Sequence, residues 1–136
     1  KSRVIILTPN EKIRDNWMNQ IANIDMMFKE RLKERNTELQ QCTGDMYSID
    51  IKSARHLNYQ RFRTEILRRI KRDFKFMGHQ EFKNQILREI GVWDGNMNSL
   101  KMEQQKILAT NYRNRLIIVD EAHNLTGENK KKTEEE

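Results

Sequence analysis

The sequence has almost no cysteine and no long apolar run. Its 136 residues include one cysteine, Cys42, so the chain cannot form an internal disulfide, and a reducing intracellular compartment is expected. No stretch approaches the roughly 20 apolar residues that a membrane-spanning helix needs, so no membrane partner is expected. The first residues also lack the layout of a secretory signal peptide and an initiator methionine. We expect Cys42 to be a half-buried structural residue.

Charged residues, in contrast, are abundant. They make up 34% of the chain against 36% hydrophobic residues, which predicts a lean core under a highly charged surface. The length fits one ordinary domain or part of a larger one. Lysine and arginine outnumber aspartate and glutamate by 26 to 20, and the sequence pI is about 9.5. This balance favours a polyanionic partner, nucleic acid above all, although proteins that bind no nucleic acid can be equally basic.

Apolar runs alternate with stretches of helical spacing along the chain. Strands are predicted at 4–7, 38–42, 74–77 and 115–119. Helices are predicted from Ile13 to Leu32 with a break near Asp25, and then over 53–72, 79–90 and 100–112. A turn is expected at 43–45 and a loop at 91–99, and the charged segment 127–136 is expected to be disordered. This alternation predicts an α/β fold with a parallel sheet flanked by helices.

The most informative segment is 116–123, which reads Leu-Ile-Ile-Val-Asp-Glu-Ala-His. Its apolar half predicts a buried parallel strand, so Asp120 and Glu121 would lie at the carboxyl end of that strand, where open α/β sheets place their ligands. Two adjacent acids suit Mg²⁺-nucleotide chemistry, because one can hold the metal's shell while the other orients or deprotonates a water. The alternative is an acidic turn that caps the next helix.

This segment resembles the DEAH form of the magnesium-binding motif of superfamily 2 helicases and translocases. Val4–Asn10, followed by Trp17 and Ile21, is similar to motif Ia of the same family. The remaining segments, Cys42–Asp45, then Phe74–Phe82, then Asn114–Leu125, follow an order that resembles the helicase-like ATPases of large nucleocytoplasmic DNA viruses. For this chain the expected reducing compartment is then the cytoplasm, the nucleus or a virion. The resemblance spans most of residues 3–126, and the DEAH box is its specific part.

The resemblance implies a function for each matching residue. Residues 1–126 would be part of the first RecA-like lobe, the ATP-binding domain 1, and 127–136 a charged tail or linker. Asp120 would hold Mg²⁺ through its water shell, Glu121 would orient and deprotonate the attacking water, and His123 would link the nucleotide site to motif III or the second lobe. Thr8, Pro9 and Asn10 would lie along the nucleic-acid track. The implied cofactors are ATP and Mg²⁺, and the implied partners are DNA or RNA and a second RecA-like lobe.

The chain departs from the family at the phosphate-binding loop. The motif Gly-x-x-x-x-Gly-Lys-Ser/Thr is absent, and in the family it precedes motif Ia, which places it before Lys1. The Ser-Ala-Thr motif and the second lobe would follow Glu136. Since backbone amides and a lysine normally cradle the phosphates, this chain alone is not expected to bind ATP tightly or to hydrolyse it. Two rivals stay open: a non-enzymatic nucleic-acid-binding or scaffold domain with a relic ATPase core, and another P-loop ATPase such as a packaging motor.

A basic segment follows the first third of the chain. Between Lys52 and Lys75 the sequence is rich in basic residues, and its only acidic residues are Glu65 and Asp73. Tyr59 lies among the basic residues. Contacts from this face to phosphates would give sequence-independent, salt-sensitive binding, with Arg68, Arg69 and Arg72 as candidate contacts. The alternative is a solvated helix face.

The histidines outside the DEAH segment, His56 and His79, have no partner at metal-ligand spacing, so structural or surface roles are expected. Trp17 and Trp93 are predicted to be packing anchors, and the methionines core filler.

Overall fold

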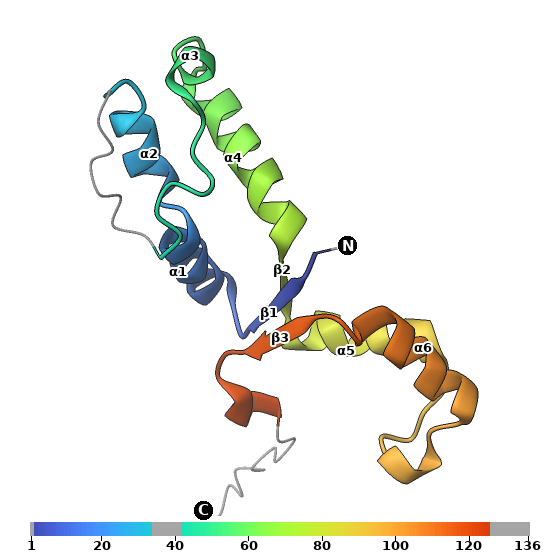
Figure 1. The fold of residues 1–136 in the computed structure, drawn as a ribbon. Coiled ribbons are helices and arrows are strands. Elements are labelled where there is room, and N and C mark those ends of the chain that lie inside the picture. The colour runs from blue at the N-terminus through green and yellow to red at the C-terminus, as the bar shows by residue number, and fades with distance from the viewer. Residues whose placement is uncertain (1, 34–41, 126–136) are drawn as a thin grey trace, which may run out of the picture.

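One parallel sheet organises the fold (Figure 1). The computed structural model describes residues 2–33 and 42–125. Strand β1 (Val4–Thr8) lies between β2 (Phe74–Gly78) and β3 (Leu116–Val119), and both outer strands run parallel to it. The register pairs Val4 with Phe74 on one side and with Leu116 on the other. Because the strands are parallel, their carboxyl ends lie at one edge of the sheet, and the candidate site residues that follow β1 and β3 therefore lie at this edge.

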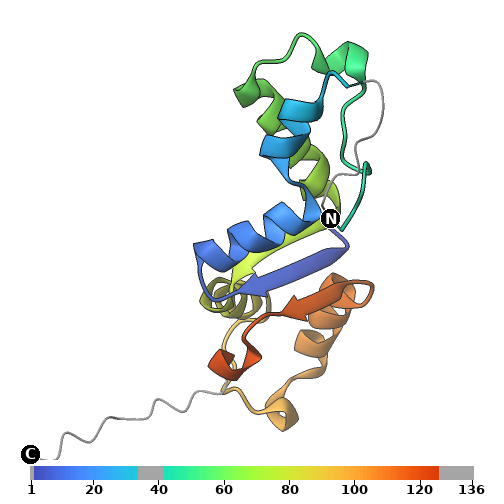
Figure 2. The same ribbon diagram turned by 90° about the vertical axis from the view of Figure 1, so that its left-hand side faces the viewer.

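Helices cover both faces of this sheet (Figure 2). They are α1 (Glu11–Ile21), α2 (Ile24–Glu30), α3 (Ile51–Ala54), α4 (Tyr59–Asp73), α5 (His79–Ile90) and α6 (Met102–Tyr112), with two short 3-10 helices at Met97–Ser99 and Ala122–Leu125. Ile6 faces the layer of α1, α2 and α4, whereas Ile5 and Leu7 face the side of α5 and α6. The predicted α/β fold with a parallel sheet flanked by helices is confirmed.

Asparagine caps set the helix boundaries that the hydrophobic pattern misjudged. Asn10, Asn23 and Asn58 each accept a hydrogen bond from a backbone N–H three residues later, which satisfies a free donor of the first turn. The break between α1 and α2 therefore falls at Ala22 and Asn23 rather than at Asp25. The single helix predicted over 53–72 is two helices for the same reason, because Asn58 starts α4.

The main core lies under α4. Phe62, Ile66 and Ile70 recur on one face of this helix and are buried against the sheet and α2, as the helical spacing predicts. Each such side chain contributes about 1.5–3 kcal/mol on burial. Exposed positions of α4 carry Arg61, Arg63, Arg68 and Arg72, so the core positions this charged surface relative to the sheet.

Strand β3 is the main departure from the expected burial. The sequence predicts a buried strand, but Leu116 is 59% exposed and Ile117 36% exposed. The reason is its place in the sheet: within residues 2–33 and 42–125, β3 pairs with β1 alone and forms an edge. The prediction that β3 is a parallel strand was correct, and the prediction that it is buried was wrong.

Several smaller predictions can also be compared with the fold. Cys42 is exposed rather than half-buried and lies in a turn. Met27 and Met77 fill the core as expected, whereas Met46, Met97 and Met102 are exposed. The rest of the candidate strand 38–42 and the segment 127–136 lie outside the described residues. Among the helices that are described, none has both the length and the apolar character needed to cross a bilayer.

Candidate functional site

Asp120 lies immediately after β3, at the edge where β1 ends in Thr8 and β2 in Gly78. Its backbone is held on both sides. The Asp120 N–H donates to the Leu7 carbonyl oxygen at 2.9 Å, and Nε2 of His79 lies 2.9 Å from the Asp120 carbonyl oxygen. The position of this residue is therefore determined by both other strands.

The carboxylate of Asp120 is held by a separate contact. The indole Nε1 of Trp17, on α1, donates to Oδ2 of Asp120 at 2.8 Å, in a partly buried position. A hydrogen bond to an ionised carboxylate is about twice as strong as a neutral one. Trp17 thus packs against the main core, as predicted for a packing anchor, and also orients a candidate site residue.

Glu121 has an unusual backbone conformation. Its φ of 54° lies in the left-handed region, which costs a non-glycine residue roughly 1–2 kcal/mol. Such a conformation persists where surrounding contacts determine it, and here Asp120 is fixed on both sides. The Glu121 side chain is 47% exposed, and its Oε2 lies 3.1 Å from Nδ1 of His123. The structure therefore brings Glu121 and His123 together and leaves the Glu121 carboxylate accessible to solvent.

The donor set at this edge can be compared with the needs of Mg²⁺. The described residues contain no group of three or more His, Cys, Asp or Glu side chains that could hold a metal by themselves. Magnesium, however, is usually bound through one or two carboxylates, several waters and the phosphates of a nucleotide. Asp120 and Glu121 supply carboxylate oxygens of this kind. The site fits a metal that arrives with a nucleotide, and it does not form a cage made of protein alone.

The three residues predicted along a nucleic-acid track have different environments. Thr8 is 1% exposed, and its Oγ1 has no hydrogen-bond partner among the described residues. Asn10 is exposed, but its side chain accepts the backbone N–H of Ile13 at 3.0 Å and so caps α1. Pro9 is half-buried. In this conformation only Pro9 and Asn10 can meet a polymer from solvent.

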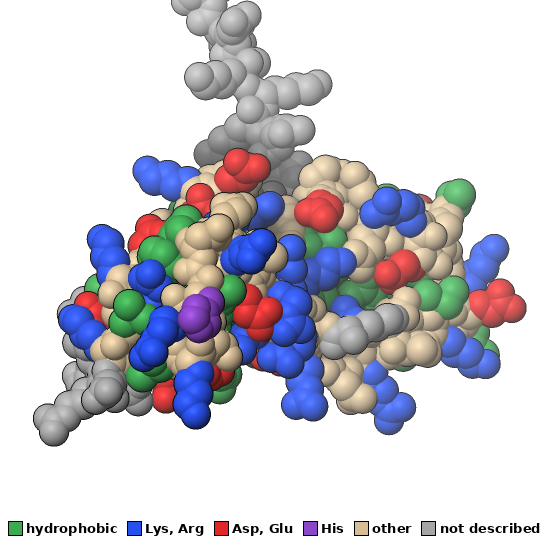
Figure 3. Space-filling view, turned by 90° about the horizontal axis from the view of Figure 1, so that it is seen from above, with side chains coloured by type: hydrophobic (Ala, Val, Ile, Leu, Met, Phe, Trp, Pro, Cys, Tyr) green, Lys and Arg blue, Asp and Glu red, His purple; other side chains and the backbone are tan. Residues whose placement is uncertain are grey.

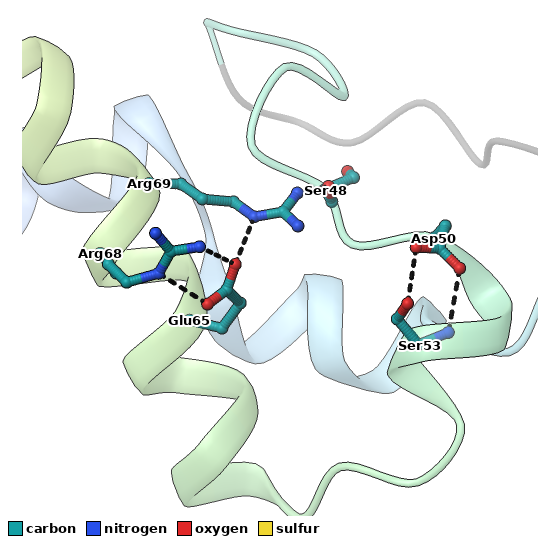
Figure 4. A network of polar contacts seen from close by, with 6 residues as sticks. All are labelled: Ser48, Asp50, Ser53, Glu65, Arg68 and Arg69. Atoms are coloured by element: carbon teal, nitrogen blue, oxygen red, sulfur yellow. Dashed lines mark hydrogen bonds and ion pairs between the residues drawn. The ribbon is translucent and has the colours of Figure 1, made fainter.

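Two of the three arginines predicted as contacts on α4, Arg68 and Arg69, bind Glu65 (Figure 4). Arg68 donates to both Glu65 oxygens at 2.9 and 2.8 Å, and Nε of Arg69 donates to Oε1 at 2.9 Å. These two guanidinium groups hold the pKa of Glu65 well below its usual range, at about 2. Arg69 also donates to the carbonyl oxygen of Ser48. Its side chain is only 27% exposed, so Arg69 serves to hold the 43–50 segment against α4.

Three exposed basic side chains of α4 form a stripe. Arg61, Arg68 and Arg72 lie seven and four residues apart, a spacing that places them on one side of the helix. The stripe extends over about 16 Å at about 1.5 Å per residue. In the space-filling view from above, lysine and arginine side chains gather near the middle of the molecule (Figure 3). We call Arg61, Arg68 and Arg72 the α4 stripe.

Sequence reasoning missed two residues of the Asp120 site. His79 directly follows β2, and the rule that parallel strands end at one edge could have placed it beside Asp120. Trp17 gave no such signal, because only the packing of α1 on the sheet determines where its indole points.

Comparisons of the chain with models of protein families, with curated proteins and with solved structures found no match. The resemblance to superfamily 2 therefore rests on the DEAH and motif Ia segments themselves.

Proposed function

We propose that this chain is part of the first RecA-like lobe of an ATP-dependent superfamily 2 helicase or translocase that acts on DNA or RNA. One observation carries the proposal: the Asp120–Glu121 pair follows a parallel strand at the carboxyl edge of the sheet, next to the end of β1. Open α/β sheets bind their ligands at this edge.

In this proposal Asp120 and Glu121 have different roles. Asp120, fixed by backbone contacts and by Trp17, holds the magnesium of Mg-ATP through water. The ion, when bound, neutralises charge on the phosphate oxygens. Glu121, whose carboxylate reaches solvent, orients the attacking water and accepts its proton. His123, in contact with Glu121, links this site to the second lobe.

The exposure of β3 supports a larger lobe. Leu116, Ile117 and their neighbours form an apolar, largely β-branched run of the kind found in the interior of parallel sheets, yet β3 is an edge in the described residues. We infer that a further strand of the lobe covers it. The phosphate-binding loop and the second lobe would likewise come from outside these 136 residues, so this chain alone would not bind ATP tightly.

The α4 stripe favours a second candidate function, a nucleic-acid-binding or scaffold domain without ATPase activity. Arg61 and Arg72 carry no salt bridge to a described acidic side chain, and phosphate binding by such a stripe needs no nucleotide site. The two functions differ in one respect: only the first requires Glu121.

Substitution of Glu121 separates them. In the full-length protein, Glu121→Gln should lower ATP turnover by about 10²–10⁴-fold, because the water loses its base while the side-chain shape is kept. Binding of Mg-ATP should stay near its original affinity. Glu103→Gln, at an exposed position of α6, is the matched control and should change neither quantity. Turnover near the original rate in the Glu121 variant would reject the ATPase proposal.

A further inference from the structure

Trp17 joins two parts of the molecule that are far apart in sequence. Helix α1 begins directly after the loop that contains Pro9 and Asn10, and Trp17 lies about two turns into it. The Trp17 ring packs against the main core, while its Nε1 reaches an acid 103 residues later. Helix α1 therefore connects the loop that contains Pro9 and Asn10 to the carboxylate of Asp120.

The contact is suited to orienting that carboxylate. An indole N–H is a donor only, and a carboxylate oxygen is an acceptor, so this bond can hold one oxygen of Asp120 in place. Leu7 and His79 bind the backbone of Asp120, whereas Trp17 binds its side chain through a hydrogen bond to Oδ2. Trp17 is therefore placed to orient this carboxylate.

We propose that Trp17 is a positioning residue for Asp120, whose indole N–H holds one carboxylate oxygen toward α1 and leaves the other for a divalent cation. The proposal rests on the proposed function, since Asp120 is taken as the residue that faces Mg²⁺. It goes beyond it by assigning a role to a residue outside the DEAH segment. It also makes the affinity of Asp120 for a cation dependent on the position of α1.

A spectroscopic experiment tests the contact without any enzyme assay. The chain has two tryptophans, so a Trp93→Phe background leaves Trp17 as the source of indole emission. In this background, Asp120→Asn should shift the Trp17 emission, because the charged acceptor is removed. The contact at 2.8 Å predicts this shift without any metal or nucleotide. Trp17 emission that is the same with and without the Asp120→Asn substitution would overturn the contact and, with it, the proposal.

A second experiment separates this proposal from the proposed function. In the full-length protein, Trp17→Phe should raise the Mg²⁺ concentration for half-maximal ATP turnover by about tenfold, the effect of losing one hydrogen bond to a charged group. Trp93→Phe is the matched control, because Trp93 donates to Asn96 in its own loop. An unchanged Mg²⁺ requirement, with turnover still abolished by Glu121→Gln, would overturn the role of Trp17 alone. Turnover that survives Glu121→Gln would instead overturn the proposed function.

Discussion

His79 reaches across the end of the central strand to the outer strand, where its Nε2 lies 2.9 Å from the backbone carbonyl oxygen of Asp120. His79 follows β2, Asp120 follows β3, and β1 lies between them. A carbonyl oxygen can only accept, so the imidazole must carry its proton on Nε2. This contact, together with the bond from the Asp120 N–H to Leu7, ties the three strand ends together and supports the left-handed conformation of Glu121.

Removal of this imidazole should therefore weaken the fold. We expect His79→Ala to lower the free energy of unfolding by about 1 kcal/mol, the usual net value of one hydrogen bond. Denaturant unfolding of the chain, followed by circular dichroism, measures the change. His56→Ala is the control, since His56 is exposed on the surface. Equal stability of the two variants would show that the His79 contact contributes nothing to the fold.

The residues predictable from sequence were those whose environment is local or periodic. Ile5, Ile6 and Leu7 form a continuous apolar run, and Phe62, Ile66 and Ile70 follow the helical repeat, so both elements and their buried faces were correctly predicted. Adjacent strand ends also follow from parallel pairing alone. These features depend on few contacts between segments that are distant in sequence.

The remaining features depend on contacts between distant segments. The partners of Glu65 and Asp120 come from side-chain rotamers, which spacing does not specify. Arg69 was predicted to face a nucleic acid, yet the carbonyl oxygen of Ser48 and the carboxylate of Glu65 bind it. The exposure of β3 likewise depends on which strands are present, a property that its own residues cannot encode.

Glu65 should make stability depend on pH in the acid range. Its pKa is lowered to about 2 by hydrogen bonds from Arg68 and Arg69, whereas a glutamate in an unfolded chain titrates near ~4.3. A lowered folded-state pKa gives stability that is present above the unfolded value and is lost as pH falls toward about 2. Glu65→Gln should therefore be less stable at neutral pH and show a flatter stability profile over this acid range. Parallel profiles for the original and variant chains, measured by urea unfolding, would contradict the assignment.

Tyr47 should make stability depend on pH in the alkaline range, where stability is lost as pH rises. Burial, and then its hydrogen bond to Asp73 at 2.9 Å, raise the pKa of this phenol to about 12. The neutral phenol is the form that the fold favours, so its stabilising effect is complete below the unfolded pKa of about 10 and is lost as pH rises toward 12. Tyr47→Phe cannot ionise, and its stability should fall less steeply between these values. Unfolding midpoints measured across this range test the prediction, and identical slopes for the two chains would refute it.

The α4 stripe can be tested through the salt dependence of nucleic-acid binding. Reversal of Arg61 and Arg72 to glutamate should weaken binding to duplex DNA and reduce the slope of log affinity against log salt by about 0.9 for each phosphate that the variant no longer neutralises. Lys83→Glu with Arg88→Glu, at exposed positions of α5, makes the same change in net charge elsewhere and is the matched control. Arg69→Gln should lower stability instead, because Arg69 binds Glu65 and Ser48. Binding by fluorescence anisotropy at several salt concentrations gives the slopes, with circular dichroism to verify folding. Equal reductions of affinity and equal slopes in the two double variants would identify the α4 stripe as a solvated helix face. The nucleic-acid track would then have to lie elsewhere, and the Pro9–Asn10 loop would be the next surface to test.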